Sequence, residues 1–187
     1  MQAIERVSKQ SGTGPGVATV RERDRLQSRS TSLRSLRVVV GQFGGLSTLT
    51  RALTRELRLC GAVVISVDEP DARAQAEAAN QFNADVYVGF EARLDGESRV
   101  SYYAVPTFES TGGRSLAERL IVGLASLTDV SPCLRGMRLQ VLRETRMPAV
   151  LLSLGSVRQT VDLAAEITAR VRDAVEAWAG QPLPTGA

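Results

Sequence analysis

Blocks of apolar residues alternate with polar turns from residue 36 onward, and the apolar spacing switches between two periods. Short, nearly continuous apolar runs predict buried strands, whereas apolar residues three or four positions apart predict helices with one buried face. The runs, together with one alternating segment, predict strands over Arg37–Val40, Ala62–Val67, Asp85–Phe90, Arg99–Val105, Arg138–Leu142 and Ala149–Leu154. The helical spacing predicts helices from the glycine turn Gly41–Gly45 up to Cys60, and over Asp71–Phe82, Gly112–Leu127 and Val157–Trp178.

The predicted strands and helices alternate along the chain, which is typical of the α/β class. Because most of the strands are apolar throughout, we expect both faces of the sheet to be covered. The pattern therefore predicts a mainly parallel, twisted sheet of about six strands flanked by helices on both faces. In the first helix, Ser47 or Thr48 is the expected cap and Gly61 the expected stop.

Three parts of the chain differ in composition. Residues 1–35 are rich in Ser, Gly and Arg and predict a basic N-terminal segment or linker. Residues 36–180 hold the α/β domain, and residues 181–187 are expected to form a frayed tail. Eight basic and three acidic residues lie in residues 1–37, which gives them a net charge of +5, whereas the whole chain carries +3. A solvated linker is the simplest explanation of this charge. The alternative is that the segment binds a phosphate-rich or acidic partner.

Composition excludes several functional classes. Only 4% of the residues are aromatic, too few for a platform that stacks bases, so nucleic acid is not an expected partner. No apolar run reaches the length of about 18 residues that predicts a membrane span. The chain has no histidine, which excludes Ser-His-Asp and Cys-His catalysis, and its two cysteines, Cys60 and Cys133, predict free thiols.

The segment Leu139–Gly155 carries the most specific motif, the pattern R-x-T-x-M-P-A-V-L over Arg143–Leu151. A second motif, A-D-V-Y-V-G-F-E-A-R, covers Ala84–Arg93, and a weaker third covers Val39–Gly45. In order and spacing these motifs resemble those of the N-acetylmuramoyl-L-alanine amidases, zinc enzymes that cleave bacterial peptidoglycan. The resemblance covers about residues 36–178 and implies an amidase-like fold.

The resemblance also implies a catalytic zinc ion held by histidine and glutamate side chains, which suit an open site that activates water. In this chain the two histidine positions fall on Phe43 and Glu91, and the catalytic glutamate position falls on Ser153. A further glutamate ligand belongs to a loop that is shortened here, since Gly45 runs almost directly into the next helix. We therefore expect neither a metal nor another cofactor.

The expected site is a cleft at the carboxyl ends of the strands, where open α/β sheets place their ligands. Its expected lining residues are Phe43, Glu91, Arg93, Arg143 and Ser153. For the charged residues, a salt bridge between Glu91 and Arg93 and a solvated Arg143 are the simpler interpretations.

The expected function is that of a non-catalytic amidase-like domain that binds a peptidoglycan fragment or precursor, or that regulates an enzyme of cell-wall synthesis. Two alternatives stay open: an active peptidoglycan amidase with an atypical metal site, and a structural module of a longer cell-wall protein. The N-terminus lacks the apolar core of a signal peptide. The chain as given is therefore expected in the cytoplasm, or at the cell wall if it is a piece of a longer exported protein.

Overall fold

The computed structural model describes residues 22–23, 25–26, 32–93, 98–127, 132–155 and 157–183. Within these residues the strands are β1 (Arg37–Phe43), β2 (Val63–Asp68), β3 (Val86–Ala92), β4 (Arg99–Val105), β5 (Phe108–Glu109), β6 (Cys133–Met137) and β7 (Ala149–Leu154). The helices are α2 (Ser47–Leu59), α3 (Ala72–Gln81), α4 (Thr111–Leu124), α5 (Gln140–Glu144), α6 (Val157–Asp162) and α7 (Ala164–Gly180).

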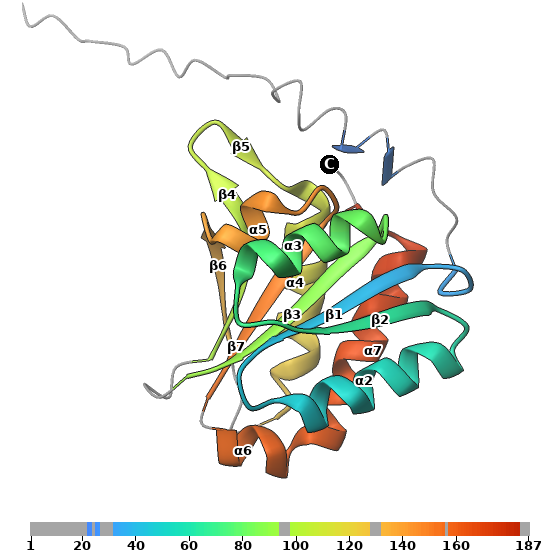
Figure 1. Cartoon of the computed structure of the whole chain (residues 1–187), viewed down its shortest axis with the longest axis vertical. Helices are drawn as coiled ribbons and strands as arrows, with labels where there is room; N and C mark the ends of the chain where they lie inside the picture. The colour runs from blue at the N-terminus through green and yellow to red at the C-terminus, as the bar shows by residue number, and fades with distance from the viewer. Residues whose placement is uncertain are drawn as a thin grey trace, which may run out of the picture.

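A single sheet forms the centre of the domain (Figure 1). Its strands follow the order β2-β1-β3-β7-β4-β5, and β6 pairs with β4. The strands β2, β1, β3 and β7 are parallel to one another, whereas β4 runs antiparallel to β7. The expected mainly parallel α/β sheet is confirmed, with seven strands among the described residues.

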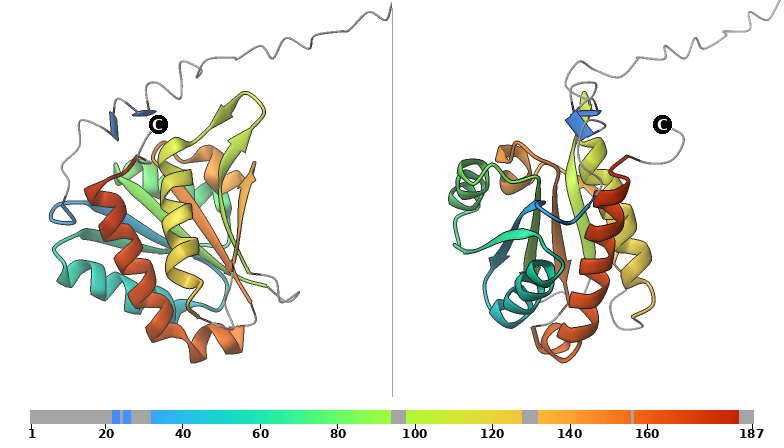
Figure 2. Two further views of the ribbon diagram at one scale, coloured as in Figure 1. Left: turned by 180° about the vertical axis from the view of Figure 1, so that it is seen from behind. Right: turned by 90° about the vertical axis from the view of Figure 1, so that its right-hand side faces the viewer.

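Helices cover both faces of this sheet (Figure 2). The helices α2, α4 and α7 pack on one face, where the larger cluster of core residues lies. The helices α3 and α5 cover the other face, over a smaller cluster that includes Val39 and Tyr87. Double coverage explains the continuous apolar runs, because Val38, Val39 and Val40 point to alternate faces and all have no exposed surface.

One predicted strand is wrong. The stretch Arg138–Leu142 leads into the helix α5, and the additional strand lies earlier, at β6. Val141 and Leu142 are both buried, which a helical turn and a strand covered on both faces explain equally well, so the apolar pattern does not distinguish the two. A single helical turn places both of them against the domain, between α3 and the sheet.

The start of α2 also differs from the prediction. Neither Ser47 nor Thr48 caps the helix; Leu46 holds the cap position, and its N–H donates to Gln42 Oε1 over 2.7 Å. A side chain of the preceding strand thus satisfies a backbone donor at the helix start. Gly61 follows the end of α2 as predicted, with a left-handed φ of 93°.

The predicted closing helix Val157–Trp178 consists of two helices. The first, α6, ends at Asp162, and α7 begins at Ala164 and continues to Gly180. No helix in the part of the chain that the structure describes is long and apolar enough to cross a bilayer.

Part of the basic N-terminal segment packs on the domain. Leu26 and Leu33 are buried and belong to the larger core cluster. Most of the predicted segment 1–35, and residues 184–187 of the predicted tail, lie outside the described residues.

Buried hydrogen bonds connect α3 to the sheet. Tyr87 Oη donates to Gln75 Oε1 over 2.6 Å, and Gln75 Nε2 donates to the carbonyl oxygens of Gln42 and Glu69, both at 2.6 Å. Neither Gln75 nor Tyr87 has exposed surface. Burial raises the pKa of the Tyr87 hydroxyl well above its ordinary value. The hydroxyl therefore stays neutral and keeps its proton for Gln75.

We expect Tyr87→Phe to lower the free energy of unfolding by about 1 to 2 kcal/mol near neutral pH, because Gln75 Oε1 loses its donor. The folded pKa of Tyr87 exceeds the unfolded one, so the contribution of Tyr87 to the stability of the wild type is complete below about pH 10 and falls by about 1.4 kcal/mol per pH unit above it. The variant lacks this loss, and its deficit should shrink as the pH rises. Urea unfolding at about pH 8 and about pH 11 tests this; a deficit independent of pH would contradict it.

Candidate functional site

Three parallel strands end in one row of side chains. The register pairs Phe43 of β1 with Glu91 of β3, and Glu91 with Ser153 of β7. Arg99, the first residue of β4, pairs with Ser153 from the other side. Residues in register point to the same face of a sheet. We call Phe43, Glu91, Ser153 and Arg99 the Glu91 row; it lies at the carboxyl ends of β1, β3 and β7.

The row continues the face of the sheet that α3 and α5 cover. Alternation along β3 puts Glu91 on the same face as Tyr87, which belongs to the smaller core cluster. At this end of the strands the cover is incomplete: the side chains of Glu91 and Arg99 are 26% and 23% exposed, whereas Ser153 is fully buried. The charged side chains of Glu91 and Arg99 are thus partly open to solvent and lie beside a buried serine.

The Glu91 carboxylate is surrounded by donors. Ser153 Oγ donates a hydrogen bond to Glu91 Oε1. Arg99 Nη2 lies 3.6 Å from the same oxygen, and Arg93 Nη1 lies 3.9 Å from it. Arg99 Nε also donates to Ser153 Oγ over 3.3 Å. The expected salt bridge between Glu91 and Arg93 is therefore present, and Arg99 is a second cationic partner.

These residues do not fit a zinc ion. A catalytic zinc site needs about three protein ligands from histidine, cysteine or carboxylate side chains. The row contributes one carboxylate, which already accepts from Ser153 and faces two guanidinium groups that would repel a divalent cation. Across the described residues, no group of three or more His, Cys, Asp or Glu side chains is arranged to hold a metal ion.

The arrangement of strands and helices recurs in solved structures. An N-acetylmuramoyl-L-alanine amidase from Clostridium difficile 630 gives a TM-score of 0.61 over 79% of this chain and 97% of its own, at 18% identity. The catalytic domain of the amidase CwlV from Bacillus (Paenibacillus) polymyxa var. colistinus gives 0.60 over 76% and 97%, at 19% identity. The chain has the amidase fold. The amidase AmiC2 of Nostoc punctiforme has the same fold: its TM-score is 0.57 over 76% of this chain and 94% of its own, at 19% identity.

No protein-family model matches the sequence, and no curated protein matches it either. Identities of 18 and 19% establish a common fold and nothing finer. The resemblance to amidases that the motifs predicted is thus confirmed at the level of the fold. The Glu91 row occupies the carboxyl edge of this amidase fold, the edge at which the site was expected.

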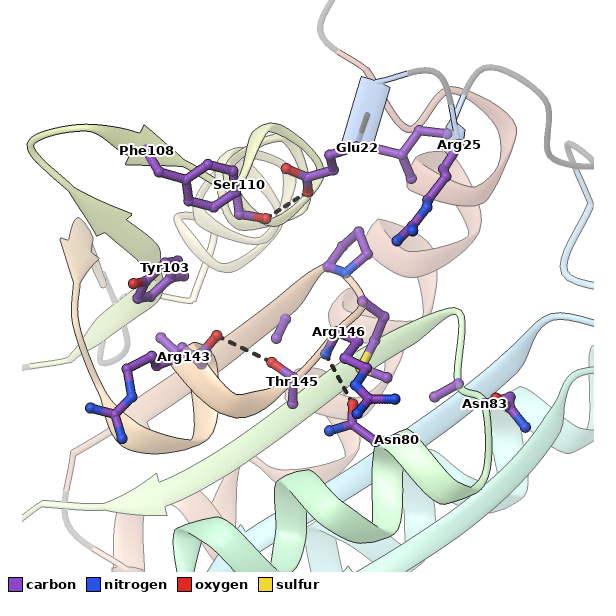
Figure 3. A pocket seen from close by; sticks show the side chains of 16 residues that line it. Glu22, Arg25, Asn80, Asn83, Tyr103, Phe108, Ser110, Arg143, Thr145 and Arg146 are labelled. Atoms are coloured by element: carbon purple, nitrogen blue, oxygen red, sulfur yellow. Dashed lines mark hydrogen bonds between the residues drawn. The ribbon is translucent and has the colours of Figure 1, made fainter. Parts of the chain in front are cut away.

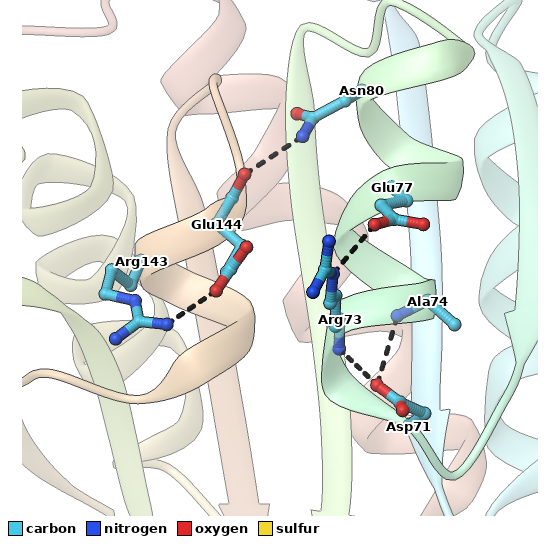
Figure 4. Close-up of polar contacts among 7 residues, drawn as sticks. All are labelled: Asp71, Arg73, Ala74, Glu77, Asn80, Arg143 and Glu144. Carbon is cyan, nitrogen blue, oxygen red and sulfur yellow. Dashed lines mark hydrogen bonds and ion pairs between the residues drawn. The ribbon is translucent and has the colours of Figure 1, made fainter.

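Arg143, expected in the same cleft, lies at the opposite edge of the sheet. It belongs to α5, which precedes β7, whereas Ser153 is near the end of β7. Its guanidinium pairs with Glu144 over 2.6 Å, and the Glu144 carbonyl accepts from Asn80 Nδ2 of α3 (Figure 4). The structure thus brings together Phe43, Glu91, Arg93 and Ser153 and separates Arg143 from them.

Arg99 is the site residue that sequence reasoning missed. It stands at the start of the predicted strand Arg99–Val105, and its own neighbourhood carries no motif. Its position follows from the antiparallel pairing of β4 with β7, which brings the beginning of one strand to the end of the other. Alternation within Arg99–Val105 indicates a strand, but not which neighbour it pairs with.

Proposed function

We propose that this chain is a non-catalytic domain of the amidase fold that binds a peptidoglycan fragment or precursor at the Glu91 row. One observation carries the proposal: where the resemblance implies metal ligands, the single carboxylate accepts a hydrogen bond from Ser153 and faces Arg93 and Arg99. The positive charge beside Glu91 comes from arginine side chains of the chain itself. Because the Glu91 carboxylate already accepts from Ser153 and faces two guanidinium groups, it is poorly placed to act as a base toward a water molecule.

The same side chains suit recognition. The Arg99 guanidinium has five N–H donors, and Glu91 together with Ser153 engages only some of them. The stem peptides of peptidoglycan carry carboxylates, which guanidinium groups bind with paired hydrogen bonds. Glu91 holds the two arginines in place, and Phe43 adds an apolar neighbour at the end of β1. Regulation of a cell-wall enzyme by such a liganded domain is a second form of the same proposal.

We expect Arg99→Gln to weaken binding of a purified disaccharide-tetrapeptide about tenfold, because one charge-assisted hydrogen bond is worth about 1.5 kcal/mol. Isothermal titration calorimetry measures the affinity, and thermal unfolding verifies that the variant folds. Arg172→Gln is the matched control: its side chain is 30% exposed and pairs with Asp173 and Glu56 away from the row. Equal losses in both variants, or no saturable binding by the wild type, would overturn the proposal.

Elemental analysis and a muropeptide-cleavage assay separate the competing functions. One zinc ion per chain, together with cleavage that Glu91→Gln abolishes, would support an active amidase with an atypical metal site. Neither zinc nor cleavage nor muropeptide binding would support a structural module of a longer cell-wall protein. Binding without cleavage is the outcome that the proposed function requires.

A further inference from the structure

A pocket lies at the opposite edge of the sheet from the Glu91 row. It opens at the amino ends of β3 and β7, between the β4–β5 hairpin, α5, the end of α3 and the N-terminal residues Glu22 and Leu26 (Figure 3). Its volume of about 460 Å³ falls in the usual range for pockets that bind small molecules. We call it the amino-edge pocket.

One side of the amino-edge pocket is aromatic and apolar. The rings of Tyr103 and Phe108 lie with their centroids 5.8 Å apart at an angle of 42°. Both side chains are half-buried, and the buried Pro148 and Leu142 add to the apolar lining. Tilted rings at this separation offer an apolar surface to a planar group.

The other side is polar and held in place by α3. Asn80 Oδ1 accepts from the backbone N–H of Arg146 over 2.9 Å, and Asn80 Nδ2 donates to the Glu144 carbonyl, also over 2.9 Å. Two hydrogen bonds from one helical side chain thus fix the turn that carries Arg146. Because this backbone is already fixed, the protein loses less conformational entropy when a ligand binds.

The charges that line the pocket are mostly positive. Its charged lining residues are Glu22, Arg25, Arg143 and Arg146. The Glu22 carboxylate is bound at the start of α4, where it accepts from Ser110 Oγ over 2.7 Å and from the N–H groups of Thr111 and Gly112 over 3.1 and 3.2 Å. The positive end of a helix dipole compensates such a carboxylate, which leaves it little capacity to neutralise Arg146.

Arg146 differs from its arginine neighbour Arg143 in its pairing. Arg143 is paired with Glu144, whereas no carboxylate within the described ranges forms a salt bridge with the exposed guanidinium of Arg146. A cation without an acidic partner, beside aromatic rings and on a fixed turn, has the chemistry of an anion-binding group.

We propose that the amino-edge pocket binds a small organic anion in which a carboxylate or a phosphate is joined to a planar apolar group. The anionic group binds Arg146, and the planar group packs on Tyr103 and Phe108. Guanidinium groups bind carboxylates and phosphates through the same charge-assisted hydrogen bonds, so both forms are tested. This site is separate from the Glu91 row and does not depend on the function proposed there.

Nuclear magnetic resonance titration of the ¹⁵N-labelled full chain tests the pocket with three probes: hippurate, phenyl phosphate, and hippuramide, the neutral amide of hippurate. We expect hippurate, phenyl phosphate or both to shift the amide signals of Tyr103, Phe108 and Arg146 in a saturable way. Hippuramide should bind at least about tenfold more weakly than hippurate, since it lacks the charge that Arg146 binds. Equal binding of hippuramide and hippurate, or shifts scattered over the surface, would overturn the proposal.

Two variants and one control test where the anionic group and the planar group of the ligand bind. Arg146→Gln should weaken the binding of the stronger anionic probe about tenfold, whereas Arg170→Gln, an exposed arginine of α7 that does not line the pocket, should leave it unchanged. Phe108→Ala should weaken the anionic and the neutral probe by the same factor. An Arg170→Gln effect as large as that of Arg146→Gln would show general charge attraction and refute the site.

Discussion

Trp178→Ala is expected to lower the free energy of unfolding by about 4 kcal/mol, the range for a large aromatic residue removed from a core. Trp178 of α7 is 2% exposed and belongs to the larger core cluster. Its indole N–H also donates to the Gly112 carbonyl at the start of α4, over 3.1 Å. The substitution leaves a cavity and removes one hydrogen bond to a buried carbonyl, so the two costs add in the free energy of unfolding.

Urea unfolding followed by circular dichroism measures this loss without relying on the deleted fluorophore. Trp178→Phe is the control, because it keeps an aromatic ring in the core and removes only the indole donor and part of the volume. It should cost about 1 to 2 kcal/mol. If Trp178→Ala cost no more than Trp178→Phe, the packing of α7 against α4 would be looser than described.

Gly41→Ala is expected to cost about 3 kcal/mol, at the upper end for an added group in a packed core. A Cβ at Gly41 would overlap Gln75 Oε1 and the Tyr87 hydroxyl, and it would lie 2.9 Å from Tyr87 Cζ. Both neighbours are fully buried and hydrogen-bonded to each other. The methyl group therefore finds space only by breaking the bond that connects α3 to the sheet.

Gly123→Ala provides the matched control for Gly41→Ala. Gly123 lies in α4, and its added Cβ would be 3.6 Å from the nearest atom, the Arg170 carbonyl oxygen. Alanine is the better helix former, so this variant should gain about 0.5 kcal/mol. The same urea titrations compare the two, and a loss in Gly123→Ala equal to that in Gly41→Ala would mean that the close approach at Gly41 is unimportant.

The sequence predicted the strands correctly where both faces of the sheet are buried, because such strands are continuous apolar runs. The runs Val38 to Val40 and Ala149 to Leu152 are covered on both faces, and apolar residues fill them. Prediction failed at the edge of the sheet: β6 is mostly exposed and has no apolar period. The short helix α5 is also hard to recognise, because five residues are too few to distinguish a helical period from an alternating one.

The grouping of the expected lining residues was predictable where parallel strands place them side by side. Phe43, Glu91 and Ser153 end strands that run side by side, so equal positions in the motifs became neighbours in space. Arg143 and Ser153 belong to the same segment, Leu139–Gly155, but Arg143 precedes β7 and Ser153 lies near its end. The strand β7 spans about 13 Å between Ala149 and Ser153. Proximity in sequence was therefore misleading for Arg143.

The docking of Glu22 on α4 determines how the domain can be attached to anything else. Glu22 binds the start of α4 and lines the amino-edge pocket. Figure 1 shows that α7 also ends near the amino ends of β3 and β7, whereas the Glu91 row lies at their carboxyl ends. A purification tag, a sensor-chip linker or a fused protein joined at either end of the described chain would therefore be carried on the pocket side. The domain would be immobilised with the Glu91 row turned toward the solution, so a surface-based assay suits measurements of muropeptide binding. For the amino-edge pocket, binding is better measured with the protein free in solution.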